Sequence, residues 1–110
     1  MTGRETTRMA GTKCSMVVGF GILTFRLHDC RSLKAKRRVV KSLIALLRNH
    51  FNASVAEVGA NDVYQRIEVG FSMVGNNGSV VNSKIDKLLN LADGFAEAEI
   101  IDSEMELMHL

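Results

Sequence analysis

The residues that most clearly point to chemistry are cations crowded into the stretch 32–51. Lys34, Lys36, Arg37 and Arg38 fall within the first turn and a half of a predicted helix. The N-terminal end of a helix carries partial positive charge, so cations there oppose the helix dipole and anions are favoured. A sequence selected for stability alone would carry Asp or Glu in that turn. The pattern therefore indicates an anion-binding surface.

We interpret the cations of this helix as contacts to nucleic-acid phosphates, and Lys34, Arg38, Lys41 and Arg48 lie at helical spacing on one side of its apolar stripe. The full candidate set comprises Lys34, Lys36, Arg37, Arg38, Lys41 and Arg48. Such contacts are largely independent of base sequence and weaken strongly with salt. The alternative is a solvated charged face that pairs with the acidic second half of the chain, for example with Asp102, Glu104 or Glu106 of a neighbouring copy.

A second possible source of chemistry is the sequence His28-Asp29-Cys30, since a thiolate nucleophile needs a nearby base. Adjacent residues on a strand point to opposite faces, and no third orienting group is evident. Cys14 and Cys30 also lack metal-ligand spacing. We therefore expect no enzymatic activity, no metal and no cofactor, and the reactivity of Cys30 stays open.

Charge is distributed unevenly along a chain of otherwise ordinary composition. The 110 residues are 46% hydrophobic and 24% charged, which suits one globular domain. Net charge is only +2, yet residues 1–50 hold 11 Lys and Arg against 2 acidic residues, and residues 51–110 hold 3 against 10. This asymmetry favours a basic face for a polyanion. Alternatively, the halves interleave in the fold and partly neutralise each other.

The ends and the cysteines of the chain bear on its compartment. Residues 1–15 are rich in Thr, Gly and Arg and lack a hydrophobic segment, so we predict a flexible basic tail rather than a secretory signal. No apolar stretch approaches the length of a membrane span. Two cysteines without a pairing pattern suit a reducing compartment. We expect a cytoplasmic protein with no membrane partner and a single domain over residues 16–110.

Hydrophobic periodicity predicts the order βαββαβ. We expect strands at 17–28, 52–59, 64–75 and 97–108, a helix over 32–51 capped by Ser32, and a second helix that Ser79 caps and Asp93-Gly94 ends. Right-handed crossovers then give an α+β sandwich of the ferredoxin-like type, a four-stranded antiparallel sheet with both helices on one face.

Finer expectations follow from the alternation within these strands. Gly19 and Gly21 should lie beneath a helix and permit its close approach. Glu57 should lie opposite Arg66 across the hairpin. In the last strand, the core-facing set should be Ile101, Met105 and Leu107.

The sheet face without helices raises the possibility of a homodimer. Val18, Phe20 and Ile22 would form an uncovered apolar strip, a feature typical of an oligomer seam. Long side chains such as those of Arg26 or Arg66 could instead cover this strip.

The same face argues against base stacking on the sheet. Its third strand offers Arg66, Glu68, Gly70 and Ser72, none of them aromatic. We therefore expect any RNA contact to be made through the helix.

Three ordered motifs resemble the YlxP-like family of small bacterial proteins. They are S-L-K-x-K-R at 32–37, V-x-E-V-G at 55–59 and D-x-x-Q-R at 62–66, and the resemblance covers residues 16–108. It implies a ferredoxin-like fold and an unknown function. Family genes often lie beside those of a translation initiation factor and a ribosome-binding factor, which implies a cytoplasmic role near ribosome biogenesis.

Together these observations predict a non-enzymatic protein that contacts RNA through the basic helix, with ribosomal RNA or a ribosomal subunit as the expected partner. Two alternatives stay open: a dimeric interaction module that binds an acidic partner surface, and a small-ligand regulatory domain of the kind this fold often supports.

Overall fold

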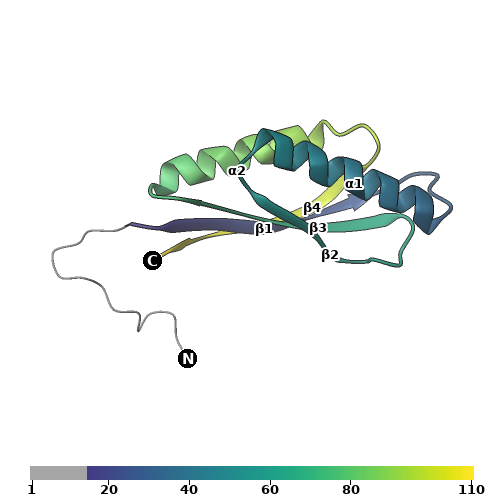
Figure 1. Cartoon of the computed structure of the whole chain (residues 1–110), viewed down its shortest axis with the longest axis horizontal. Helices are drawn as coiled ribbons and strands as arrows, with labels where there is room; N and C mark the ends of the chain where they lie inside the picture. Colours follow the sequence, from purple (N-terminus) through teal and green to yellow (C-terminus); the bar gives the residue numbers. More distant parts are fainter. Residues whose placement is uncertain (1–14) are drawn as a thin grey trace, which may run out of the picture.

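The computed structural model describes residues 15–110, and the predicted tail lies outside them except for Ser15 (Figure 1). The element order confirms the predicted βαββαβ arrangement. The elements are β1 (Val17–Arg26), α1 (Leu33–His50), β2 (Ser54–Gly59), β3 (Arg66–Gly75), α2 (Gly78–Asp93) and β4 (Glu99–His109).

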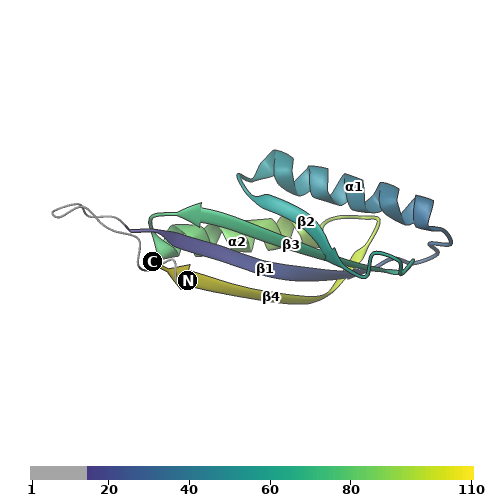
Figure 2. The ribbon, with the colours of Figure 1, turned by 60° about the horizontal axis from the view of Figure 1, so that its bottom comes forward.

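The strands form one antiparallel sheet in the order β2-β3-β1-β4, so β2 and β4 are its edges. Both helices lie on the same side of this sheet, with α1 packed on β2 and α2 packed on the other three strands (Figure 1). The second face carries no helix. Figure 2 shows β4 along one margin of the sheet and α1 with β2 along the other. The predicted fold class, an α+β ferredoxin-like sandwich, is confirmed.

The core lies between the helices and the covered face of the sheet. Every second residue of β1 and β3 points into it, as the period of two requires. The buried side chains at its centre are Leu23, Phe25, Val40, Leu43, Leu47, Val55, Ile67, Val69, Val81, Ile85 and Leu88.

The two helices begin at different kinds of cap. The Ser32 hydroxyl accepts a hydrogen bond from the Ala35 amide at 3.1 Å, as predicted. The predicted cap of α2, Ser79, is wrong. Asn77 has extended backbone angles, and its side-chain oxygen accepts from the Val80 amide at 3.2 Å, so α2 starts before Ser79 and includes it in its first turn.

The predicted pairing of Glu57 with Arg66 is also wrong. The ladder between β2 and β3 shifts after Glu57, which places Glu57 opposite Val69 and Gly59 opposite Glu68. The connection between the strands is longer than a tight hairpin, since β3 begins only at Arg66. Arg66 instead forms an ion pair within its own strand, its Nε 2.7 Å from Glu68 Oε2.

A second register shift corrects the face assigned to Ile101. The ladder between β1 and β4 shifts between Thr24 and Phe25, so Phe25 pairs with Ile100. The extra residue of such a bulge changes which side chains face inward. Ile100 consequently packs against the core, and Ile101 is exposed.

Gly19 lies beneath α2, as predicted. A β-carbon added there would lie 2.4 Å from Ile85 Cδ1 and 2.8 Å from Val81 Cγ1. Gly21 has different neighbours, because a β-carbon there would meet the Glu104 carbonyl oxygen and the Phe71 ring. Gly19 therefore permits the close approach of α2, as Gly75 does beside Val81, and the prediction for Gly21 is corrected.

We predict that Gly19→Ala destabilises the fold by about 1–3 kcal/mol, because the added methyl group overpacks the contact between β1 and α2. Denaturant unfolding followed by circular dichroism measures this change. Gly94→Ala is the matched control: its methyl group would meet the Leu91 carbonyl oxygen at an ordinary 3.5 Å, so stability should change by less than about 0.5 kcal/mol. Equal stability of the two variants would contradict the packing we describe.

Candidate functional site

Lys36 does not belong to an exposed cationic surface. Its side chain is only 1% exposed, and its ammonium lies 3.2 Å from Glu57 Oε2 and donates a hydrogen bond to the Ala60 carbonyl. Glu57 Oε2 is buried without a hydrogen bond from any residue within 15–110, so the Lys36 ammonium is its compensating charge. The inclusion of Lys36 in the anion-binding set is therefore corrected.

The helical phase explains why Lys36 turns inward. It falls on the buried stripe of α1 that also contains Val40, Leu43 and Leu47, so its aliphatic stem packs in the core. The ammonium reaches the connection between β2 and β3 at Ala60, which has a positive φ of 54°. The spacing of positions 36, 40 and 43 places Lys36 on the apolar stripe of the helix, and this periodicity is the sequence signal that marks it as buried.

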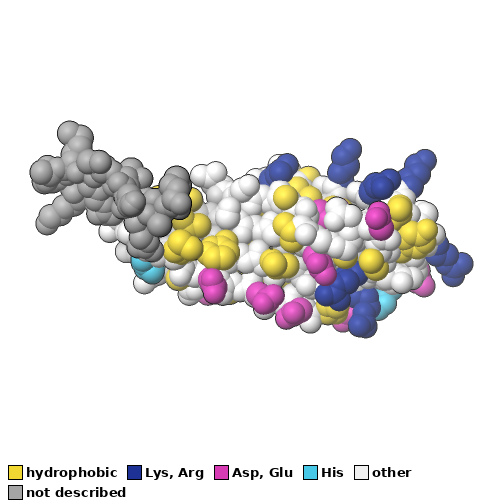
Figure 3. Space-filling model, turned by 90° about the horizontal axis from the view of Figure 1, so that it is seen from below, with side chains coloured by type: hydrophobic (Ala, Val, Ile, Leu, Met, Phe, Trp, Pro, Cys, Tyr) yellow, Lys and Arg dark blue, Asp and Glu magenta, His cyan; other side chains and the backbone are white. Residues whose placement is uncertain are grey.

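The remaining cations at the start of α1 are exposed and have no ionic partner among residues 15–110. Lys34, Arg37, Arg38 and Lys41 make no ion pair with any described residue, and the first turn of α1 contains no acidic residue. In Figure 3, which looks onto the helix-free face of the sheet, Lys and Arg side chains gather toward one end and margin, and Asp and Glu side chains line much of the opposite margin.

Arg48 continues this set to the end of α1 but has a structural contact. Its guanidinium donates to the Val55 carbonyl of the edge strand β2 at 2.7 Å. A groove of about 860 Å³ lies between α1 and β2, and Arg37, Lys41 and Arg48 are among its lining residues. Cations beside an apolar floor of this kind suit an extended anionic chain.

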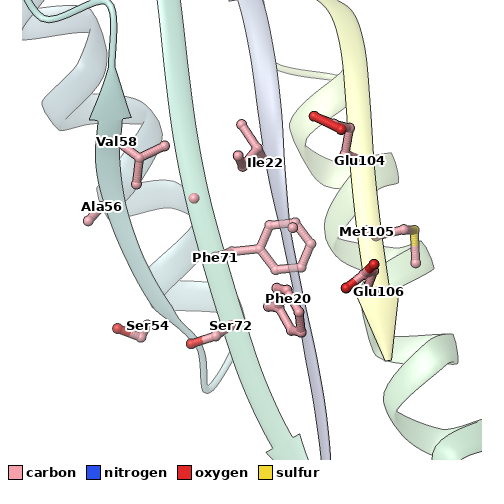
Figure 4. A pocket seen from close by; sticks show the side chains of 12 residues that line it. Phe20, Ile22, Ser54, Ala56, Val58, Phe71, Ser72, Glu104, Met105 and Glu106 are labelled. Atoms are coloured by element: carbon pink, nitrogen blue, oxygen red, sulfur yellow. The ribbon is translucent and has the colours of Figure 1, made fainter. Parts of the chain in front are cut away.

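The helix-free face of the sheet, hereafter the open face, is hollowed by a depression of about 670 Å³ (Figure 4). Phe20 and Ile22 of β1 line it together with small residues of β2 and β3, and Glu104 and Glu106 of β4 lie at its side. Ile22 is 40% exposed, and Val18 and Phe20 are half-buried. These three residues share the open face, as the alternation of the sequence predicted; their role as an oligomer seam stays a prediction.

Arg26 and Arg66 lie together at one end of the open face, as direct cross-strand partners opposite the end at Val18. Arg66 is engaged by Glu68, and Arg26 has Glu99 as its partner position in β4. The depression lined by Phe20 and Ile22 contains neither arginine among its lining residues.

The sequence His28-Asp29-Cys30 forms part of the connection before α1. His28 Nε2 lies 3.2 Å from Glu99 Oε1, and the buried thiol of Cys30 donates to the Ser32 carbonyl at 3.5 Å. Over residues 15–110, no three His, Cys, Asp or Glu side chains are grouped so that they could hold a metal ion. Neither helix in this part of the chain is long and apolar enough to cross a membrane.

We predict that Lys36→Ala destabilises the protein by about 3 kcal/mol, because it leaves the Glu57 carboxylate buried without its charge partner. This value is the lower end of the destabilisation that follows when one partner of a buried ion pair is removed, because 20% of the Glu57 side-chain surface remains exposed. Chemical denaturation measures the loss. Lys34→Ala, an exposed change on the same helix, is the control and should cost less than about 0.5 kcal/mol.

The double variant Lys36→Met/Glu57→Leu should recover most of the loss, because it removes both charges at once. A single variant as stable as the wild type would show that the contact contributes nothing.

Comparison with solved structures finds low sequence identity. The de novo designed protein Foldit4 is 15% identical with a TM-score of 0.46, covering 87% of this chain and 96% of that chain. SnoaB, a cofactor-independent oxygenase from Streptomyces nogalater, is 15% identical with a TM-score of 0.41, over 84% and 90% of the two chains. LarC2, the C-terminal domain of a cyclometallase, is 14% identical with a TM-score of 0.43, over 87% and 57%.

Sequence comparison is more specific. The family model described as "Protein of unknown function (DUF503)" matches residues 18–105. The "Uncharacterized protein YlxP" of Bacillus subtilis (strain 168) is 31% identical over 83 residues, which are 76% of this chain and 90% of that protein. The motifs at 32–37, 55–59 and 62–66 all fall within the matched region. The chain therefore belongs to the DUF503 family of proteins of unknown function, whose members include YlxP.

Proposed function

We propose that this protein binds the phosphate backbone of RNA, and that the exposed cations of α1 make the contacts. Ribosomal RNA is the expected class of RNA. The observation that carries the proposal is the lack of ionic partners at Lys34, Arg37, Arg38 and Lys41 within residues 15–110. In the same structure Lys36 and Arg66 do have carboxylate partners. An external anion such as a phosphate group would supply the ionic partner that these cations lack among residues 15–110.

The length of the row supports an extended ligand rather than a single phosphate. Lys34 and Arg48 are separated by 14 positions of α1, which corresponds to about 21 Å at the rise of an α-helix. The groove between α1 and β2 runs beside this row. A nucleic-acid strand presents one phosphate per nucleotide, so several successive phosphates can be contacted along α1.

The open face supports binding that tolerates many base sequences. On β3 its residues are Glu68, Gly70 and Ser72, flanked by Arg66 and Val74, and none offers an aromatic ring on which a base could stack. The acidic side chains of β4 on the same face would repel phosphates. Contacts that are restricted to the phosphate backbone hold an RNA in place without reading its base sequence.

The test is a salt titration of binding to ribosomal RNA and to a single-stranded homopolymer, followed by fluorescence polarisation. The variant is Lys34→Ala/Arg37→Ala/Arg38→Ala. We expect the slope of log affinity against log salt to fall by about 0.7 for each cation that contacts a single-stranded phosphate. The matched control, Lys84→Ala/Lys87→Ala, removes exposed cations from α2 and should leave affinity and slope unchanged.

Two outcomes would overturn the proposal. One is the absence of binding by the folded wild type at about 50 mM salt, a condition that strengthens phosphate contacts. The other is an equal loss in the α2 control, which would show that only net charge matters. A saturable complex with an acidic protein, without RNA binding, would assign the same cations to a protein partner.

A further inference from the structure

The open face leaves apolar side chains uncovered by any described residue. Ile22, Val58 and Val74 are exposed large hydrophobic residues of this face, and the half-buried Phe20 lines the depression together with Ile22 and Val58. Both helices pack on the other side of the sheet (Figure 1). A contiguous apolar area on a small domain marks an interaction surface more often than scattered exposure does.

The relief of this face is self-complementary. The larger side chains stand on β1, at Phe20 and Ile22, and their direct partners on β3 are the small residues Ser72 and Gly70 (Figure 4). A ridge thus runs beside a hollow, on either side of the line between β1 and β3. A two-fold axis along that line would lay the ridge of each copy over the hollow of the other.

The charges of the two margins favour the same axis. One margin is acidic, because Asp102, Glu104 and Glu106 lie on the open side of β4. The other margin carries no charge on this face, because β2 contributes Ser54, Ala56 and Val58 to it. An axis parallel to the strands places β4 of one copy over β2 of the other. The perpendicular in-plane axis would place the two acidic rows over each other, which is unfavourable.

The size of the face is sufficient for a specific dimer. The four strands have 10, 6, 10 and 11 residues, and at about 3.3 Å per residue and about 4.8 Å between strands they give a face on the order of 600 Å². Two such faces in contact bury about 1,200 Å², the lower end of the range for stable interfaces. A second copy matches relief, charge and area together.

We propose that the open face binds a second copy of this chain, sheet against sheet, about a two-fold axis parallel to the strands and between β1 and β3. The dimer places α1 of each copy on an outer side, away from the contact between the sheets. Dimer formation is therefore independent of the phosphate contacts at Lys34, Arg37 and Arg38, and the two proposals fail separately.

The experiment is sedimentation equilibrium of the full chain over a range of micromolar concentrations. We expect the wild type to have twice the mass of the 12.1 kDa chain. Phe20→Glu/Ile22→Glu should shift the mass to that of a monomer, because it buries two carboxylates against an apolar surface. Val80→Glu is the control: Val80 is 50% exposed on α2, away from the sheet, and the variant should stay dimeric.

Ser72→Arg keeps the test decisive if the double variant fails to fold. It fills the hollow opposite Phe20 without changing the ridge, so it should also produce a folded monomer, which circular dichroism verifies. A wild type that remains monomeric at about 100 µM overturns the proposal, as does an open-face variant that folds and stays dimeric.

The direction of the axis has its own test. Glu104→Gln/Glu106→Gln should leave the dimer about as strong as that of the wild type, because β4 of one copy faces the uncharged open side of β2 of the other and not its acidic row. A stronger dimer would overturn the proposed axis and indicate that the acidic rows face each other. The RNA-binding variant Lys34→Ala/Arg37→Ala/Arg38→Ala should keep the mass of the wild type.

Discussion

The structure depends on one constraint: a sandwich of two layers can bury only one face of its sheet. The helices α1 and α2 pack on the side of Leu23, Phe25, Ile67 and Val69, and those residues supply the core. This packing leaves two surfaces exposed. One is the outer side of α1, whose cations have no ionic partner within residues 15–110, and the other is the open face with Phe20 and Ile22. The core and the two surfaces for which we propose binding thus lie on opposite sides of the same elements.

Lys36 shows how close the core-forming residues of α1 lie to its exposed cations. It is one of four cations in a run of five residues, yet it alone is buried and paired. A buried ammonium is tolerated only when a charge and a hydrogen-bond acceptor meet it, and Glu57 with the Ala60 carbonyl supplies both. The contact joins α1 to the connection between β2 and β3, and so fixes the helix whose outer side carries the other cations.

The fold could be predicted from sequence because it rests on local periodicity. The alternation over 17–26 and the stripe at Val40, Leu43 and Leu47 are sufficient to assign the elements, and turn residues separate them. The predictions failed where the geometry depends on distant partners. The register shifts near Glu57 and Thr24 are set by how two strands pack under a helix, and they decide whether Ile100 or Ile101 faces inward. The predicted cation set on α1 was wrong at one residue for a related reason: charge density alone does not show which cation is buried, and only the packed helix separates Lys36 from its neighbours.

The two edge strands have a consequence for how the protein avoids misassembly. An exposed edge presents unpaired amides and carbonyls that can recruit further strands into fibres. Here β2 has only six residues, and the Arg48 guanidinium occupies the Val55 carbonyl. The other edge, β4, is long but carries Asp102, Glu104 and Glu106, whose like charges disfavour the stacking of identical copies in register. Both edges of the sheet therefore carry features that disfavour the addition of further strands, so an exposed apolar face need not lead to amyloid-like polymerisation.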